Sequence, residues 1–166
     1  MTSAGTAGSS CSISDRVYVI RIVTGRRDSG KSSYLRSLAR STGAGGFIAE
    51  KAYGVSGEIG FDLLTLPSGD RRPLARVAGD DGSAPGPEWF RFRRFFFDEA
   101  SFRWARERAA EILKRPDCPL ILDEIGPLEL EGRGLYSVFL RFLASSRELT
   151  VSCRPALASW VGERAA

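Results

Sequence analysis

The segment from Gly25 to Ser32 constrains the fold more than any other part of the sequence. It reads GRRDSGKS and matches the pattern G-x-x-x-x-G-K-[S/T], in which glycines let the backbone wrap closely around a phosphate chain. A β-branched apolar run precedes it, and a run with leucine and alanine at helical spacing follows it and should stop before Gly43. The order strand, glycine loop, helix aims backbone N–H groups and a helix N-terminus at an anion. The sequence therefore predicts a phosphate-binding loop.

Two side chains in this loop have specific expected roles. Lys31 should reach the β and γ phosphates of a nucleotide, and Ser32 should offer its hydroxyl to Mg²⁺. Arg26 and Arg27 add two guanidinium groups, which either stabilise a bound triphosphate or are solvated at the crest of the loop; we favour solvation. We expect the phosphate contacts to come from the whole segment: Gly25, Arg26, Arg27, Asp28, Ser29, Gly30, Lys31, Ser32 and Ser33.

A second signal is an apolar run that ends in two acids. The sequence LIL at 120–122 has the pattern of a buried strand, and Asp123 and Glu124 follow it directly. A carboxylate at the end of such a strand is costly unless a cation or a donor meets it. In phosphate-loop proteins the first acid joins the metal shell and the next can orient or deprotonate the attacking water. We therefore expect Asp123 to be a metal ligand and Glu124 to be catalytic.

The order of elements along the chain favours an open α/β sheet with helices on both faces. Apolar runs at 17–23, 120–122 and 149–153 are typical of parallel strands buried on both faces, although Arg21 conflicts with that environment. Asp98 is expected to cap a helix that Pro116 closes. A later amphipathic helix is expected to carry its apolar face on Tyr136, Phe139, Leu140 and Leu143.

The domain organisation follows from composition. Residues 1–15 are small and polar and are expected to be a flexible tail, and residues 16–166 are expected to form a single domain. Turn residues between apolar alternations predict an antiparallel hairpin inserted at about 52–77, and a glycine- and proline-rich stretch predicts a mobile loop at about 78–88.

Composition excludes several kinds of chemistry. The 166 residues contain no histidine, which rules out histidine-ligated metals and Ser-His-Asp triads. The three cysteines form no C-x-x-C pair, so a reducing, cytoplasmic location is expected. No apolar run approaches about 18 residues, so no membrane span is expected. The formal charge of +4 permits polyanionic ligands without favouring nucleic acid. The sequence does not indicate an oligomeric state.

Two further features carry alternatives. The sequence WFRFRRFFF at 89–97 interleaves arginine with aromatic residues, as single-stranded nucleic-acid binders do. It fits no clean strand, and we favour core or lid packing of its phenylalanines, with nucleic-acid contact as the weaker alternative. Arg154 follows the run at 149–153 and would share a sheet edge with the phosphate loop. It would then act on the γ-phosphate as a catalytic residue, or form a surface salt bridge.

Taken together, these motifs resemble the small P-loop nucleoside-triphosphatases first described from thermophiles, to which an animal cancer-related nucleoside-triphosphatase is related. The resemblance runs from about residue 17 to residue 160. It rests on the loop, on Asp123–Leu130 (DEIGPLEL) above all, and on three shorter matches: Gly46-Phe47 with Glu50, Gly60-Phe61-Asp62, and Leu74-Ala75-Arg76. It implies a RecA-like, mostly parallel α/β sheet and slow, Mg²⁺-dependent hydrolysis of nucleoside triphosphates with little base preference. It also places Lys31 and Ser32 on phosphate and metal, Asp123 in the metal shell and Glu124 on the water.

Three functional hypotheses remain open from the sequence. The first is a nucleoside-triphosphatase with Mg²⁺ as cofactor and water as acceptor, and Glu124 favours it because a kinase must exclude water. The second is a kinase that passes the γ-phosphoryl group to a nucleoside, nucleotide or metabolite. The third is a nucleotide-binding adapter whose hydrolysis is incidental.

Overall fold

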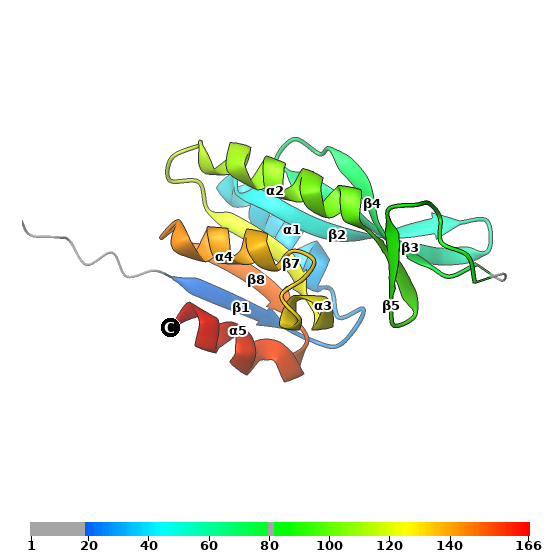
Figure 1. The fold of residues 1–166 in the computed structure, drawn as a ribbon. Coiled ribbons are helices and arrows are strands. Elements are labelled where there is room, and N and C mark those ends of the chain that lie inside the picture. Colours follow the sequence, from blue (N-terminus) through cyan, green and yellow to red (C-terminus); the bar gives the residue numbers. More distant parts are fainter. Residues whose placement is uncertain (1–18, 80–81) are drawn as a thin grey trace, which may run out of the picture.

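The computed structural model describes residues 19–79 and 82–166 (Figure 1). The expected tail at 1–15 lies outside the described residues, as do two residues of the loop expected at 78–88. Among the described residues the helices are α1 (Lys31–Thr42), α2 (Glu99–Leu113), α3 (Pro127–Leu130), α4 (Tyr136–Ala144), the 3₁₀ turn η1 (Pro155–Leu157) and α5 (Ala158–Ala165). The strands are β1 (Ile20–Thr24), β2 (Gly45–Gly54), β3 (Gly57–Leu66), β4 (Arg71–Val77), β5 (Trp89–Phe92), β6 (Phe95–Asp98), β7 (Leu120–Ile125) and β8 (Leu149–Cys153).

The described strands form one sheet with the order β1-β8-β7-β2-β3-β4-β6-β5. The strands β1, β8, β7 and β2 run parallel, as expected for the core of an α/β fold. From β2 onward every neighbouring pair is antiparallel. The antiparallel part is therefore larger than the hairpin expected at 52–77, because β2 continues past the parallel core and β5 and β6 extend the sheet beyond β4.

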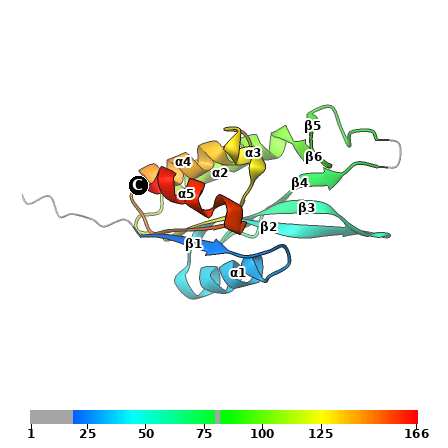
Figure 2. The ribbon, with the colours of Figure 1, turned by 90° about the horizontal axis from the view of Figure 1, so that it is seen from below.

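Helices cover both faces of the parallel core, which confirms the expected α/β architecture. Figure 2 shows α1 against one face and α2, α4 and α5 against the other. On the first side Leu35 and Ala39 of α1 pack against Ile48 and Ile121. On the second side Phe102, Phe139 and Phe142 belong to the larger cluster, which also contains the apolar residues of β8 and those of β7 other than Ile121. Burial of these two clusters holds the sheet between its helices.

The first strand departs from the sequence prediction. The run at 17–23 was expected to be buried on both faces, but β1 lies at the sheet edge next to β8, and its residues are only partly buried or exposed. Arg21 is accommodated there because its guanidinium reaches Glu148 at the surface. The edge position resolves the conflict that an arginine would cause in a central strand.

The other two apolar runs behave as expected. Leu120, Ile121 and Leu122 of β7 are buried, and so is every residue of β8. The central strands have helices on both sides, so their side chains are buried on both faces.

The helices agree with the sequence with one exception. Asp98 caps α2 by accepting hydrogen bonds from the N–H groups of Ala100 and Ser101, and α1 ends before Gly43. The predicted stripe on α4 is partly wrong, because Leu140 is 42% exposed while Val138 and Phe142 are buried. The buried face of α4 is therefore rotated from the expected one.

The segment at 89–97 also differs from the prediction that it fits no clean strand. It forms the antiparallel pair β5 and β6, in which Phe92 lies opposite Phe95. Arg93 takes a left-handed backbone conformation, with φ of 57°, at the turn between them. The turn resets the alternation, which explains why a single strand pattern does not fit the nine residues. Phe96 is buried and Phe97 packs against the core, as expected, whereas Phe95 is only partly buried and lies outside the core cluster.

Candidate functional site

The loop between β1 and α1 has the conformation that the glycine pattern predicts. Gly30 is the N-cap of α1 with φ of 85°, and no side chain caps the helix, so the first-turn N–H groups can meet an anion. Asp28 also takes a left-handed conformation, with φ of 60°. Lys31 Nζ donates to the carbonyl oxygens of Gly25 and Arg26, at 2.9 and 2.8 Å. The lysine charge is thereby held within the curve of the loop.

A charged network ties this loop to the β2–β3 hairpin. Lys51 Nζ lies 2.7 Å from Asp28 Oδ1 and 3.1 Å from Glu58 Oε2, and Arg27 pairs with Glu58. Lys51 holds the pKa of Asp28 below its usual range. We favoured a solvated side chain for Arg27 over one that contacts the triphosphate, but its guanidinium forms an ion pair with Glu58 instead. Sequence reasoning missed Lys51 and Glu58, because the hairpin that carries them is far from the loop in the chain.

The loop meets the end of β7 through Ser32 and Asp123. Ser32 Oγ donates to Asp123 Oδ2 at 2.7 Å, and the N–H of Ala49 lies 3.3 Å from the same oxygen. The hydroxyl of Ser152 donates to the other carboxylate oxygen. Burial raises the pKa of Asp123, and the three hydrogen bonds oppose that rise. The structure thus brings together the two residues that the sequence assigns to the metal.

Glu124 sits on a strained piece of backbone. Its φ is 63°, and the pairing of β7 with β8 shifts register between Leu122 and Ile125, which marks a bulge. The N–H of Glu124 donates to Ser152 Oγ at 2.9 Å. Its side chain remains accessible to solvent. Desolvation and the charge of Asp123 raise its pKa, while Lys31 and two arginines oppose the rise.

These oxygen donors suit a hard divalent cation. Among the described residues no group of three or more His, Cys, Asp or Glu side chains could hold a metal unaided. Ser32 and Asp123 would supply one hydroxyl and one carboxylate oxygen, and Mg²⁺ commonly completes such a shell with water and substrate phosphates. The donor set therefore fits Mg²⁺ bound together with a nucleotide.

Arg154 occupies the predicted place. It follows β8, which runs parallel to β1 and β7, so it lies at the same sheet edge as the loop and the two acids. Arg154 and Glu124 line the same cavity, and the arginine charge opposes the rise in the pKa of Glu124. Among the described residues it has no salt bridge, so the surface ion pair considered from the sequence is absent.

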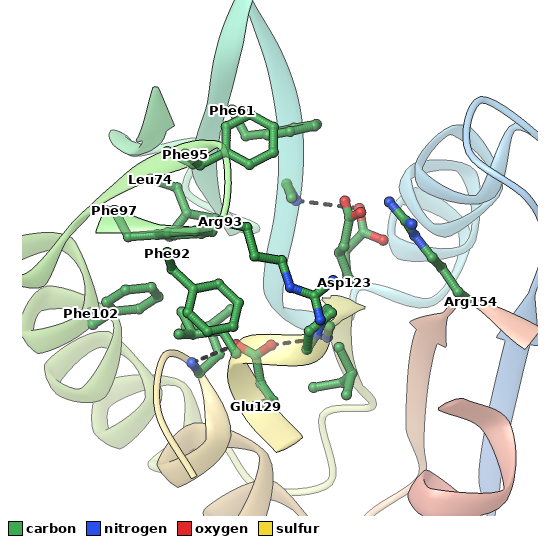
Figure 3. Close-up of a pocket in the computed structure, with 18 of the residues that line it drawn as sticks. Phe61, Leu74, Phe92, Arg93, Phe95, Phe97, Phe102, Asp123, Glu129 and Arg154 are labelled. Carbon is green, nitrogen blue, oxygen red and sulfur yellow. Dashed lines mark hydrogen bonds between the residues drawn. The ribbon is translucent and has the colours of Figure 1, made fainter. Parts of the chain in front are cut away.

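A cleft and a cavity meet at the two acids. The cleft, of about 540 Å³, is lined by the loop, Ser32, Ser33 and Lys51. The cavity, of about 520 Å³, lies on the other side of Asp123 and Glu124 and is bounded by β3, β4, the β5–β6 hairpin, α2 and the segment after β7 (Figure 3). Residues that line both are Arg27, Ala49, Phe61, Asp123 and Glu124.

The segment after β7 carries a buried acid that sequence reasoning assigned only to the family motif. Glu129 accepts hydrogen bonds from the N–H groups of Gly126 and Leu135, both at 2.9 Å. It is 5% exposed, and desolvation raises its pKa from 4.5 to about 7. Glu129 thus fixes the loop that forms one wall of the cavity.

Ser152 is a further site residue that the sequence does not single out. It is fully buried and contacts both Asp123 and Glu124. The available signal was a serine in the middle of an otherwise apolar strand, since a buried hydroxyl needs partners. The sequence does not say which partners these are.

Comparison with known proteins agrees with this geometry. A family model described as NTPase matches residues 21–161. The solution structure of a human cancer-related nucleoside triphosphatase is 24% identical, covers 82% of this chain and 75% of its own, and has a TM-score of 0.55. The crystal structure of THEP1 from the hyperthermophile Aquifex aeolicus is 19% identical; the match covers 88% of this chain and 83% of the THEP1 chain, with a TM-score of 0.65. No curated protein matches the chain. At these identities the two structures support the fold alone.

The sheet, the glycine loop before α1 and the acids at the end of β7 define a P-loop α/β protein. Since the family model covers most of its length, the chain belongs to the NTPase family. In the described part of the chain, no helix is long and apolar enough to cross a membrane.

Proposed function

We propose that this protein hydrolyses nucleoside 5′-triphosphates such as ATP and GTP to the diphosphate and phosphate, with Mg²⁺ and without strict preference for the base. The observation that carries the proposal is the 2.7 Å contact between Ser32 and Asp123, which joins the phosphate loop to the end of β7. Glu124 follows at the point where the cleft and the cavity meet. A metal-binding pair and an accessible carboxylate at one phosphate site are what hydrolysis requires.

The chain's own residues divide the work. The loop N–H groups and Lys31 bind the phosphates, and Ser32 and Asp123 would hold Mg²⁺, which would neutralise phosphate charge when bound. Glu124 orients the attacking water and accepts its proton, since its carboxylate is accessible where the cleft and the cavity meet, and desolvation and Asp123 raise its pKa. Arg154 offers a positive charge beside Glu124 for the charge that develops on the γ-phosphate.

The cavity favours one alternative, a kinase that passes the phosphoryl group to a small molecule. It opens at Glu124, on the side of the acids away from most of the loop. A phosphoryl acceptor would have to bind at such a place. A nucleotide-binding adapter is the alternative that follows if no turnover is found. Nucleic acid is not favoured as a partner, because Phe96 is buried and Phe92, Phe95 and Phe97 line the cavity instead of an open surface that a strand could follow.

We also propose a cytoplasmic location. Cys118 and Cys153 are free and buried within the described residues, which is typical of a reducing compartment.

The test is a panel of ATP, GTP, CTP and UTP, with diphosphate and phosphate measured separately. We expect equal amounts of both products, loss of activity in EDTA and recovery with Mg²⁺. Lys31→Ala should weaken triphosphate binding strongly, and Asp123→Asn should weaken its metal-dependent part. Glu124→Gln should slow turnover by about 10²–10⁴-fold with binding retained, whereas the exposed Glu131→Gln should have no effect. Full turnover in Glu124→Gln would exclude the proposed mechanism.

A further inference from the structure

The cavity beside Glu124 has a wall of aromatic side chains. Phe61, Phe92, Phe95 and Phe97 line it and are only partly buried. The rings of Phe95 and Phe97 lie 6.2 Å apart and nearly perpendicular, and Phe92 meets Phe97 in the same way at 6.3 Å. Figure 3 shows these rings gathered on one side of the cavity. Accessible aromatic surface inside a hollow of this volume is typical of a small-molecule site.

The aromatic wall is rigidly supported. Phe97 stacks on the buried Phe102 of α2 at 6.1 Å, and Phe61 meets Phe95 edge to face at 5.7 Å. Edge-to-face and offset contacts of this kind fix the orientation of each ring. A flat ligand would therefore find a preformed surface.

Positive charge faces the same hollow. Arg93, Arg94 and Arg154 line it, and none of them has a salt bridge among the described residues. Figure 3 shows Arg93 extending from the aromatic wall toward the side of Asp123 and Glu129, and Arg154 rising beside Asp123. Arg93 takes the left-handed backbone conformation at the tip of the hairpin, and it is one of the residues that line the cavity.

Three acids line the cavity: two of them, Asp123 and Glu129, are engaged by other donors, and the third, Glu124, forms no salt bridge with the arginines among the described residues. Asp123 is engaged by Ser32 and Ser152, and both oxygens of Glu129 accept backbone N–H groups. The guanidinium of Arg93 lies over the ring of Phe92, 5.6 Å from its centroid, and that of Arg94 over the ring of Phe95 at 4.7 Å. Guanidinium groups that have aromatic neighbours but no carboxylate partner attract an anion, because charge-assisted hydrogen bonds beside an apolar surface are strong.

We propose that this cavity binds a second ligand, a planar aromatic molecule that carries an anionic group. Its ring lies against Phe92 and Phe97, and its anion meets Arg93 and Arg154. The assignment rests on the proposed function only for the position of the reacting phosphate. Since Asp123 and Glu124 also line the cleft, the ligand occupies the space next to that phosphate. Its two plausible sources are a nucleoside monophosphate and an aromatic carboxylate.

The test is calorimetric titration of the full chain with its loop saturated by Mg²⁺ and a non-hydrolysable ATP analogue. The probes are AMP, 2-naphthoate, the uncharged 2-naphthol, and inorganic phosphate. We expect AMP or 2-naphthoate to bind at least about tenfold more tightly than both 2-naphthol and phosphate. Binding of AMP alone identifies the nucleotide class, and binding of 2-naphthoate alone identifies the carboxylate class.

Variants separate this site from its surroundings. Arg93→Gln should lower the affinity for the probe that binds the parent by at least about tenfold, whereas Arg91→Gln should leave that affinity unchanged. Arg91→Gln removes the same charge from the same hairpin, but Arg91 does not line the cavity. Phe92→Leu should lower the affinity for the aromatic probes AMP and 2-naphthoate without creating affinity for inorganic phosphate. Equal affinities in Arg93→Gln and the parent, or no binding of AMP and 2-naphthoate, would overturn the proposal.

The phosphate loop is tested independently by Lys31→Ala. If that variant loses the ATP analogue but still binds the aromatic anion, the cavity site stands by itself. If the ATP analogue binds normally to the parent and neither aromatic anion does, the proposed function survives and the cavity assignment fails.

Discussion

Removal of the Ser152 hydroxyl tests how far one buried group organises the site. The serine is fully buried in β8, donates to Asp123 and accepts from the N–H of Glu124 at 2.9 Å. In Ser152→Ala, the Asp123 carboxylate loses a donor and the Glu124 N–H loses its acceptor. Both groups belong to the proposed hydrolytic centre.

The expected loss of stability is appreciable. A buried N–H left without a partner costs about 1–3 kcal/mol, and a hydrogen bond to a charged group contributes about 1.5–3 kcal/mol. Part of this is relieved, because the pKa of Asp123 rises further and the carboxyl group is more easily protonated. We therefore expect a decrease of about 2–4 kcal/mol in the free energy of unfolding. For a chain of this size that lowers the melting temperature by roughly 5–15 °C.

The second expected effect is on metal binding. Ser152 orients Asp123, and loss of such a supporting contact typically weakens metal affinity by about 10–100-fold. Calorimetric titration of Mg²⁺ in the presence of a non-hydrolysable ATP analogue measures this effect, and thermal unfolding measures the first.

Ser101→Ala is the matched control. Ser101 is also fully buried, and its hydroxyl lies 2.6 Å from the carbonyl oxygen of Pro73 and 2.7 Å from Asp98, away from the site. It should lower the melting temperature without changing Mg²⁺ affinity. The reasoning is refuted if Ser152→Ala weakens Mg²⁺ binding no more than Ser101→Ala does, or if it leaves the melting temperature unchanged.

Three further predictions concern backbone strain and the buried acid. In Gly46→Ala, at φ of 141°, the new Cβ would lie 1.9 Å from the Ile121 carbonyl oxygen. We therefore expect the free energy of unfolding in urea to fall by at least about 2 kcal/mol. The loss should be smaller in Gly57→Ala, where φ is 117° but nothing lies within 4 Å of the new Cβ. Glu124→Gly relieves a left-handed backbone, so it should raise stability by about 1 kcal/mol while turnover is lost, and an unchanged or lower melting temperature would contradict this. Glu129 has a pKa of about 7 against an ordinary 4.5, so the folded chain binds more protons between these values and its contribution to stability is lost as pH rises from 4.5 through 7. The stability of the parent relative to Glu129→Gln should therefore fall by about 3 kcal/mol between pH 4.5 and pH 8, and a pH-independent difference would exclude the raised pKa.

The phosphate site could be predicted from sequence because its parts are local or follow from topology. The loop conformation depends on glycine and lysine within eight residues of one another. The meeting of Ser32 with Asp123, 91 residues away, follows once β1 and β7 are parallel, because parallel strands end at the same edge. The location of Arg154 follows from the same rule.

The cavity could not be predicted in this way. Its aromatic wall depends on the turn at Arg93 and Arg94, which divides one ambiguous run of arginine and phenylalanine into two paired strands. Its opposite wall is the segment after β7, which Glu129 holds in place by accepting two backbone N–H groups. The edge position of β1 could not be predicted for a related reason. Strand order is set by long-range packing, and an apolar run has the same residue pattern in an edge strand as in a central strand.

The bulge at Asp123 and Glu124 explains why two adjacent acids have separate roles. In a regular strand the two side chains would point to opposite faces of the sheet. The register shift between Leu122 and Ile125 instead keeps both acids at the sheet edge, where Asp123 bonds to Ser32 and Glu124 reaches the cavity. The letters of the sequence do not reveal such a bulge, because it adds no special residue. The left-handed backbone at Glu124 costs about 1–2 kcal/mol, and Ser152 holds it by accepting the Glu124 N–H. The same hydroxyl donates to Asp123, so a single buried serine couples the metal-binding acid to the water-activating one.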